Sequence, residues 1–433
     1  MSAILLAVLL ALAGRALPVS RWTVRLMAGA VMFHLLLTAY DFLGVRWGRV
    51  AVVLPLLVLA GLGRRTARTP RTARTLDWGE GAALFALTTF AAFAPTLWIT
   101  TPDFIFHWGL KGERFFLARG VDYSWLAKEW NWVIHPDYPN LLPELFAGTA
   151  ILEGRFEASP QMLWSVLFFA LILVSGREAL RQTDLPGKAP RPFAPAGLAI
   201  AAFALAGFGI VHRMAGAADW MPALALAAAL PALLRPADRE ANREGDWEVG
   251  IAAAFAATSK IEGMPLAAFL AGVQLLRRRE MGAALRLGLP MAVVAGTWAI
   301  QTFRHGLYQK FNSGTFDLGR APEVLRGLAE VAGWKESWHG LTLVLLAAPL
   351  LLLPRRTRAA GAVISLQLLF YLWTYLSSAV DTEYQVVASF PRLAMHLFPA
   401  VVVAGVVALG ESRGGACPRP GGGKPLPYIT EGS

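Results

Sequence analysis

The sequence predicts an all-α, polytopic membrane protein. Hydrophobic residues make up 56% of the 433 residues and charged residues 16%, against about 45–50% and about 25% in soluble domains. The mean hydropathy is +0.49, and the chain holds a single cysteine, Cys417. These values exclude a soluble globular enzyme, a disordered chain and a disulfide scaffold. Since each span takes about 20 residues, we expect about 10–12 transmembrane helices.

The apolar runs give the expected spans in chain order. The N-terminus has no basic n-region and no clear cleavage site, so we expect a first span there and no signal peptide. Further apolar runs lie at 26–44, 50–63, 79–99, 159–176, 193–212, 217–234, 287–302, 339–354, 359–379 and 396–410. We treat residues 1–410 as one domain and the Gly- and Pro-containing residues 411–433 as a disordered cytoplasmic tail.

Clusters of basic residues predict the orientation, because short cytoplasmic loops are enriched in Lys and Arg. Five such clusters lie at 64–74, 177–191, 235–243, 277–279 and 355–358. Placing all of them in the cytoplasm puts three segments on the outer side, near 100–158, 303–338 and 380–395. Arg46 and Arg49 then also fall outside, against the same rule.

The stretch between the third and fourth clusters is too short for two full spans, at about 28 apolar residues. TSKIEG (258–263) interrupts it. We expect two half-length helices that dip in from the cytoplasm and return, with Lys260 and Glu262 in the break. A single span, which would place 277–279 outside, is the alternative. A lysine in apolar surroundings must pair or reach water, and Glu262 is a local partner. At the cytoplasmic end of such a hairpin, Lys260 would not reach an outer phosphate.

The first outer segment, 100–158, is dense in aromatic and acidic residues. This composition is typical of helices that lie in the membrane interface, or of an aromatic belt that anchors the fold. Six of the seven histidines map to outer loops or outer ends of spans, namely His107, His135, His212, His305, His339 and His396. We therefore expect any chemistry at the outer face. No two histidines have the close spacing that fixes a metal on one helix, so no metal ligand is assigned and a divalent cation stays open as a cofactor.

Four charged or titratable residues near span ends are candidates for function. Asp103 directly follows a span, and Pro102 before it fixes the chain direction. Asp219 starts a span and is either a site residue or a helix cap. Arg392 and His396 are four residues apart and share a helix face, where they either hold a phosphate or snorkel to the interface.

Five segments, in order, resemble bacterial membrane glycosyltransferases of the GT-C superfamily, within the dolichyl-phosphate-mannose–protein mannosyltransferase-like group. They are DFIFHWGLKGERFFLARG (103–120), HPDYPNLLPEL (135–145), ADWMPALAL (218–226), TSKIEG (258–263) and FPRLAMHLFPA (390–400). The chain departs from the group's pattern at Trp220 and Ile261, and no second acid directly follows Asp103.

The resemblance implies a GT-C-like bundle with interfacial helices in the first outer loop. It also implies transfer of a sugar from a polyprenyl-phosphate donor to an acceptor hydroxyl, with inversion and without a nucleotide sugar. Asp103 matches the group's catalytic base, and a hydroxyl nucleophile needs such a base. Cations must stabilise the leaving phosphate, and the expected ones are Lys111, Arg392 and His396. The expected acceptor-side or supporting residues are His107, His135, Asp137, Tyr138 and Asp219.

The expected partners are a polyprenyl-phosphate sugar donor, an envelope glycan, lipid or protein acceptor, and membrane lipids. Nucleic acid is not expected, although the net charge is +11, because the arginines lie in short loops between apolar runs. We expect the inner membrane of a bacterium, with the active site facing the periplasm or exterior. The alternatives are a transporter or lipid-linked-sugar flippase, a catalytically inactive scaffold relative, and an O-antigen ligase-like enzyme. A transporter more often shows internal repeats, and we find none.

Overall fold

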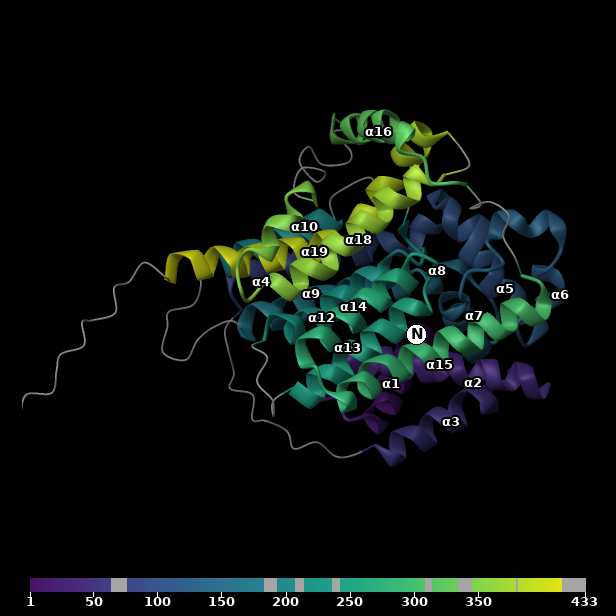
Figure 1. The fold of residues 1–433 in the computed structure, drawn as a ribbon. Coiled ribbons are helices and arrows are strands. Elements are labelled where there is room, and N and C mark those ends of the chain that lie inside the picture. The colour runs from purple at the N-terminus through teal and green to yellow at the C-terminus, as the bar shows by residue number, and fades with distance from the viewer. Residues whose placement is uncertain are drawn as a thin grey trace, which may run out of the picture.

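The computed structural model describes residues 1–63, 76–182, 193–206, 214–235, 242–307, 314–333, 345–378 and 381–414. Every regular element within these ranges is helical, which confirms the all-α class (Figure 1). Six helical segments are long and apolar enough to cross a membrane: Trp22–Leu43, Trp78–Thr100, Ala158–Arg181, Met281–His305, Arg358–Leu376 and Thr382–Gly410. Four shorter apolar helices accompany them. These lengths and compositions support a membrane-embedded protein.

The chain begins with α1 (Ser2–Ala13), η1 (Gly14–Ala16), α2 (Trp22–Leu43), α3 (Arg49–Leu62) and α4 (Trp78–Phe93), which η2 (Ala94–Thr100) continues. Helices α1 and α2 approach closely through glycine. A Cβ atom on Gly29 would meet the carbonyl oxygen of Leu10, and one on Gly14 would meet that of Arg25. Small residues allow such backbone contact between helices in lipid.

The expected outer segment folds into short helices. They are the π-helical turn η3 (Phe104–Trp108), α5 (Gly109–Ala118), α6 (Tyr123–Leu126), η4 (Glu129–Ile134), α7 (Leu141–Glu153) and α8 (Ala158–Gln161). Most of α7 is buried, and its Glu144 lies 2.7 Å from Nδ1 of His34 on α2. This helix is therefore part of the protein core and not an interfacial one.

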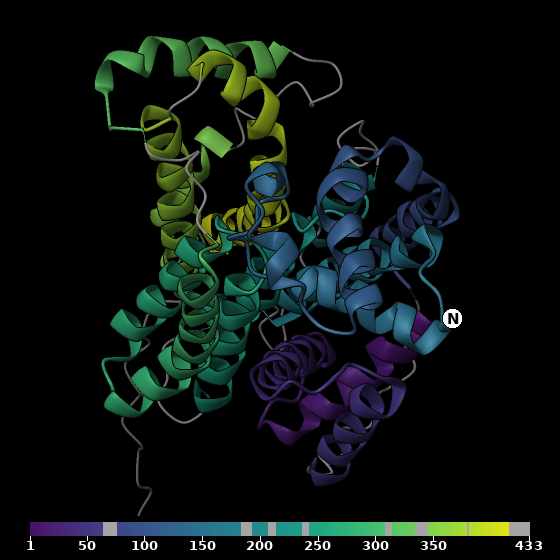
Figure 2. The ribbon, with the colours of Figure 1, turned by 90° about the vertical axis from the view of Figure 1, so that its right-hand side faces the viewer.

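The remaining elements are α9 (Leu163–Gln182), α10 (Ala194–Ala206), α12 (Trp220–Leu234), α13 (Asn242–Ala257), α14 (Gly263–Arg278), α15 (Met281–His305), η6 (Leu318–Arg320), α16 (Ala321–Gly333), η8 (Ala348–Leu352), α18 (Arg358–Leu376) and α19 (Thr382–Gly414). Every residue of α12 is buried, and it packs against α9, α13 and α19. The N-terminal helices lie on one side of the bundle and the green and yellow C-terminal helices on the other (Figure 2).

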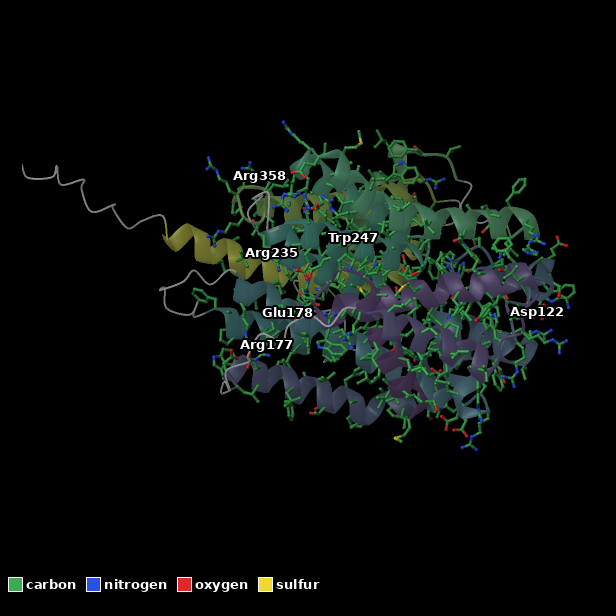
Figure 3. All side chains as sticks on the ribbon, turned by 90° about the horizontal axis from the view of Figure 1, so that it is seen from below. Asp122, Arg177, Glu178, Arg235, Trp247 and Arg358 are labelled. Carbon is green, nitrogen blue, oxygen red and sulfur yellow. The ribbon has the colours of Figure 1, made fainter. Side chains whose placement is uncertain are left out.

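The basic loops gather at one end of the bundle. Arg177 of α9, Arg235 at the end of α12 and Arg358 at the start of α18 lie toward the same end, with Asp122 toward the opposite end (Figure 3). Residues 64–74, with Lys188, Arg191 and Arg239, lie outside the described part. At the Asp122 end, the ring of His305, the last residue of α15, stacks on Tyr123 at 3.9 Å. These described residues of the basic clusters therefore lie away from the end that carries Asp122, and the membrane orientation stays a prediction.

The hairpin around TSKIEG corrects one expectation. Helices α13 and α14 have 16 residues each, which is about 24 Å of helix, so they are not half-length. Near the start of α13, Asp246 accepts from Gln274 of α14 at 3.1 Å and lies 3.3 Å from Arg278. Both feet of the hairpin therefore lie together, which rules out a single span, and its apex lies deep in the bundle.

Two further expectations about the C-terminal region need correction. Residues 382–395, expected in an outer loop, are helical as the start of α19. The helix also continues past the expected boundary at 410 to Gly414. The rest of the expected tail lies outside the described residues. Pro391 and Pro399 sit inside α19.

Candidate functional site

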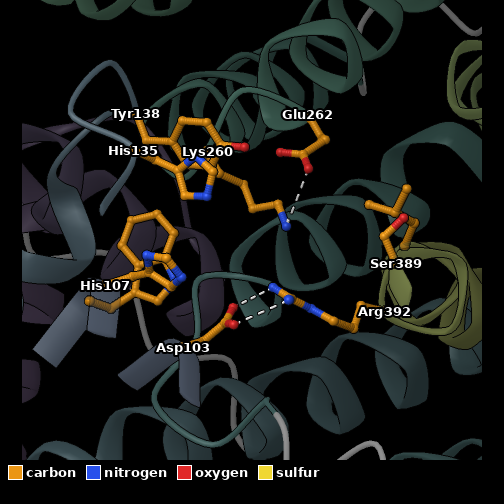
Figure 4. Close-up of a pocket in the computed structure, with 10 residues that line it drawn as sticks. Asp103, His107, His135, Tyr138, Lys260, Glu262, Ser389 and Arg392 are labelled. Carbon is orange, nitrogen blue, oxygen red and sulfur yellow. Dashed lines mark hydrogen bonds and ion pairs between the residues drawn. The ribbon is translucent and has the colours of Figure 1, made fainter. Parts of the chain in front are cut away.

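A cavity of about 130 Å³ gathers residues from four separated segments of the chain (Figure 4). One side, which we name the charged wall, consists of Asp103, Lys260, Glu262 and Arg392. The other side, which we name the aromatic wall, consists of His107, Trp108, His135 and Tyr138. Ser389 and Leu393 complete the lining. All four segments belong to or adjoin those that the resemblance singled out.

Asp103 and Arg392 form a two-pronged ion pair on the charged wall. Arg392 Nη1 donates to Asp103 Oδ1 at 3.2 Å, and Nη2 donates to Oδ2. Asp103 lies between η2 and the π-helical turn η3, while Arg392 follows Pro391 in α19. Such a fork-to-carboxylate geometry fixes both side chains and occupies both carboxylate oxygens.

Asp219 is the centre of the charge network behind this wall. Its Oδ1 accepts from Lys260 Nζ at 2.7 Å and lies 3.2 Å from His396 Nε2, and its Oδ2 accepts from Arg392 at 2.9 Å. The carboxylate makes no capping hydrogen bond to α12, so the helix-cap alternative is wrong. Burial favours the neutral acid, but Arg392 and Lys260 hold the pKa of Asp219 well below its usual range.

Lys260 lines the cavity, so the alternative in which it lies at the cytoplasmic end of its hairpin is wrong. The apex of the α13–α14 hairpin carries it to Asp219 and places its Nζ 3.5 Å from Glu262 Oε1. Burial alone would lower the pKa of Lys260, but the charges of Asp219 and Glu262 outweigh it and raise that pKa. The local pair with Glu262 exists, yet the shorter contact joins Lys260 to Asp219, 41 residues earlier.

The aromatic wall is a set of neighbouring rings, of which His135 and Tyr138 are stacked. The His135 ring stacks on Tyr138 at 4.4 Å and lies 5.1 Å from His107, and Trp108 lies 6.0 Å from Tyr138. His135 has a φ of 51°, an uncommon conformation for a residue with a side chain. Lys111 Nζ donates to its carbonyl at 2.6 Å, which helps to hold the turn.

Lys111 and His396 do not line the cavity, although both were expected at the donor phosphate. Lys111 is fully buried beneath Trp108, and this burial lowers its pKa to about 7. His396 is also fully buried and joins Asp219 to Tyr371, whose hydroxyl lies 2.6 Å from His396 Nδ1. They support the walls from behind, and Arg392 and Lys260 are the cations that face the cavity.

Asp137 is a supporting residue as well. Its backbone carbonyl accepts from Trp298 Nε1 at 2.9 Å, which ties the loop to α15. Burial raises the pKa of its carboxyl to about 6. Of the remaining expected histidines, His305 stacks on Tyr123 away from the cavity, while His212 and His339 lie outside the described residues.

Sequence reasoning missed the polar stripe on α18. Gln367, Tyr371 and Tyr375 follow one another at intervals of four, so they share a helix face. Tyr371 contacts His396, and the Tyr375 hydroxyl lies 2.9 Å from Ser389 Oγ. The spacing of these polar groups within an apolar span was the available signal.

Within the described ranges, no group of three or more His, Cys, Asp or Glu side chains is placed to hold a metal ion. Comparison of the chain with protein-family models, characterised proteins and solved structures found no match. Function is therefore inferred from the cavity itself.

Proposed function

We propose that this protein is an integral-membrane glycosyltransferase of the GT-C type. It moves a sugar from a polyprenyl-phosphate donor to an acceptor hydroxyl at the outer face of a bacterial inner membrane. The observation that carries the proposal is that Asp103, which is paired with Arg392, lines one small cavity together with Lys260. That cavity offers a carboxylate for a hydroxyl proton, cations for a phosphate and aromatic rings for a sugar.

In the reaction, the acceptor hydroxyl oxygen bonds to the anomeric carbon of the donor sugar. The bond from that carbon to the phosphate oxygen breaks, and the electron pair leaves with the polyprenyl phosphate. The hydroxyl proton passes to Asp103, while Arg392 and Lys260 stabilise the charge on the departing phosphate. Attack opposite the leaving group inverts the anomeric centre.

The ion pair between Asp103 and Arg392 gives the donor phosphate a role in preparing the base. Both oxygens of Asp103 accept from Arg392 before a donor arrives. A donor phosphate competes for the same guanidinium fork. Binding of the donor therefore frees the oxygens of Asp103 to accept the hydrogen bond of the acceptor hydroxyl.

The test uses purified protein in nanodiscs, radiolabelled polyprenyl-phosphate sugars and a membrane extract as the acceptor pool. Asp103→Asn should lower the transfer rate by about 10²–10⁴-fold, the usual contribution of a general base. Donor binding should be retained or tightened, since Arg392 loses its competing carboxylate. The matched control is Asp122→Asn, which removes an outer-end carboxylate paired with Arg114 and away from the cavity. Equal transfer by wild type and Asp103→Asn would contradict the assigned base.

One observation favours a second candidate, an inactive scaffold relative. Asp103, Asp219, Lys260 and Arg392 neutralise one another, and such a network can also serve only to hold helices together. In that case Asp103→Asn would lower stability, and no donor of the panel would be transferred or bound by wild type.

A further inference from the structure

Glu262 differs from the other two carboxylates of the site in its hydrogen bonding. Both oxygens of Asp103 and both oxygens of Asp219 are engaged by cations. Within the described part of the chain, neither side-chain oxygen of Glu262 accepts a hydrogen bond. Lys260 stands 3.5 Å from Oε1 as an ion pair, and Oε2 is buried without a partner. A buried carboxylate oxygen that accepts no hydrogen bond is uncommon in proteins, so we expect a bound group to donate one to it.

The local structure holds Glu262 at the cavity without using its carboxylate. Glu262 stands at the start of α14, yet its side chain makes no capping hydrogen bond. Its backbone carbonyl accepts from Gln367 Nε2 of α18 at 3.0 Å, so the main chain is anchored from the neighbouring helix. The side chain is therefore positioned and still has its full capacity to accept hydrogen bonds.

Glu262 also lies where the two walls meet. Figure 4 shows its carboxylate directed toward Lys260 and the hydroxyl end of Tyr138. Burial, and after it the charge of Glu262, raises the pKa of the Tyr138 phenol. A ring placed against the aromatic wall would thus present its edge groups to Glu262, with its phosphate toward Arg392 and Lys260. The edge groups of a sugar ring are hydroxyls, which are hydrogen-bond donors.

We propose that Glu262 binds the donor sugar through hydroxyl groups on the ring and so selects which sugar the protein accepts. This inference rests on the proposed function and assigns the sugar-binding residue of that site. The competing explanation is that Glu262 only balances the charge of Lys260. The two explanations differ in which part of the donor lipid should respond to a change at Glu262.

The experiment measures Kd for polyprenyl monophosphate and for polyprenyl-phosphate glucose, mannose, galactose and arabinose, with the full chain in nanodiscs. Wild type should bind at least one sugar lipid more tightly than the monophosphate. Glu262→Gln should raise the Kd for that sugar lipid by at least about tenfold, because a hydrogen bond to a charged group is lost. Binding of the monophosphate should be unchanged or tighter, since a nearby negative charge is removed.

Two variants keep the test decisive. Glu330→Gln makes the same change at an exposed position on α16 outside the cavity and should alter neither Kd. Glu262→Asp keeps the charge beside Lys260 with a shorter reach, and should weaken the sugar lipid alone. If Glu262→Gln does not fold, the Kd values of Glu262→Asp decide the test.

Equal losses for the sugar lipid and the monophosphate, or no loss for either, would overturn the inference and leave the proposed function standing. No binding of any lipid by wild type would overturn both.

Discussion

Replacing Asp219 with Asn should destabilise the protein strongly. The carboxylate is 1% exposed and accepts from Lys260 at 2.7 Å and from Arg392 at 2.9 Å. The variant removes the negative charge while Lys260 stays buried and Arg392 is only 28% exposed, and its amide group can at best satisfy them in part. Lys260 then keeps only Glu262 at 3.5 Å, and Arg392 keeps only Asp103.

The magnitude follows from the burial. Removing one partner of a buried ion pair costs about 3–5 kcal/mol. An unfolding entropy of about 2.1 cal/mol/K for each residue gives about 0.9 kcal/mol/K for a chain of 433 residues. Dividing the free-energy cost by this unfolding entropy gives a fall in Tm of about 3–5 °C.

The assay is thermal unfolding in detergent, with Glu330→Gln as the control for loss of an exposed charge. A double variant, Asp219→Asn with Lys260→Gln, separates the cause. If the cost comes from the unpaired ammonium group, the double variant should be more stable than the sum of the single changes predicts. An unchanged Tm for Asp219→Asn, or strict additivity in the double variant, would refute the reasoning.

Two further predictions concern the support of the site and the helix packing. Burial lowers the pKa of Lys111 from 10.5 to about 7. Between these pH values the unfolded chain binds more protons than the folded one, so the stability of the folded state should rise with pH. Lys111→Met should flatten this rise, and equal slopes of Tm against pH for both proteins at pH 7–10 would count against the prediction. Gly29→Ala should lower the free energy of unfolding by about 1–3 kcal/mol, because the added Cβ clashes with Leu10. In the control, Gly296→Ala, the added Cβ meets nothing within 4 Å, so Tm should be unchanged or higher. Similar Tm values for the two variants would contradict close α1–α2 packing.

The candidate residues were predictable to different degrees. Asp103, Asp219 and Arg392 were found from their places at span ends. The four-residue spacing of Arg392 and His396 predicted that they share a helix face, and both contact Asp219. The reach of Lys260 was not predictable, because the apolar count of its hairpin suggested half-length helices. Two helices of 16 residues carry it to the cavity instead.

No local feature of the sequence predicted that Asp103 pairs with Arg392. Asp103 and Arg392 are 289 residues apart, and nothing in the period or composition of either segment names the other as its partner. Lys111 and His396 were expected to face the donor phosphate but lie behind the cavity walls, and the reason is the same. Whether a side chain faces a cavity or lies behind its wall depends on how the other helices pack.

The sequence by itself determined the all-helical class of the protein. Long apolar runs must form helices in lipid because the backbone has no other way to satisfy its hydrogen bonds, and basic residues are sparse within those runs because a charge is costly to bury in lipid. Both constraints act within a short window of chain. The tertiary structure decided which charges meet. It brought Asp103, Lys260 and Arg392 together at one cavity with Asp219 behind them, and among the described residues it left the carboxylate of Glu262 without a hydrogen-bond donor. Ion pairs of this kind depend on distances between helices, and those distances are set only when the whole bundle packs.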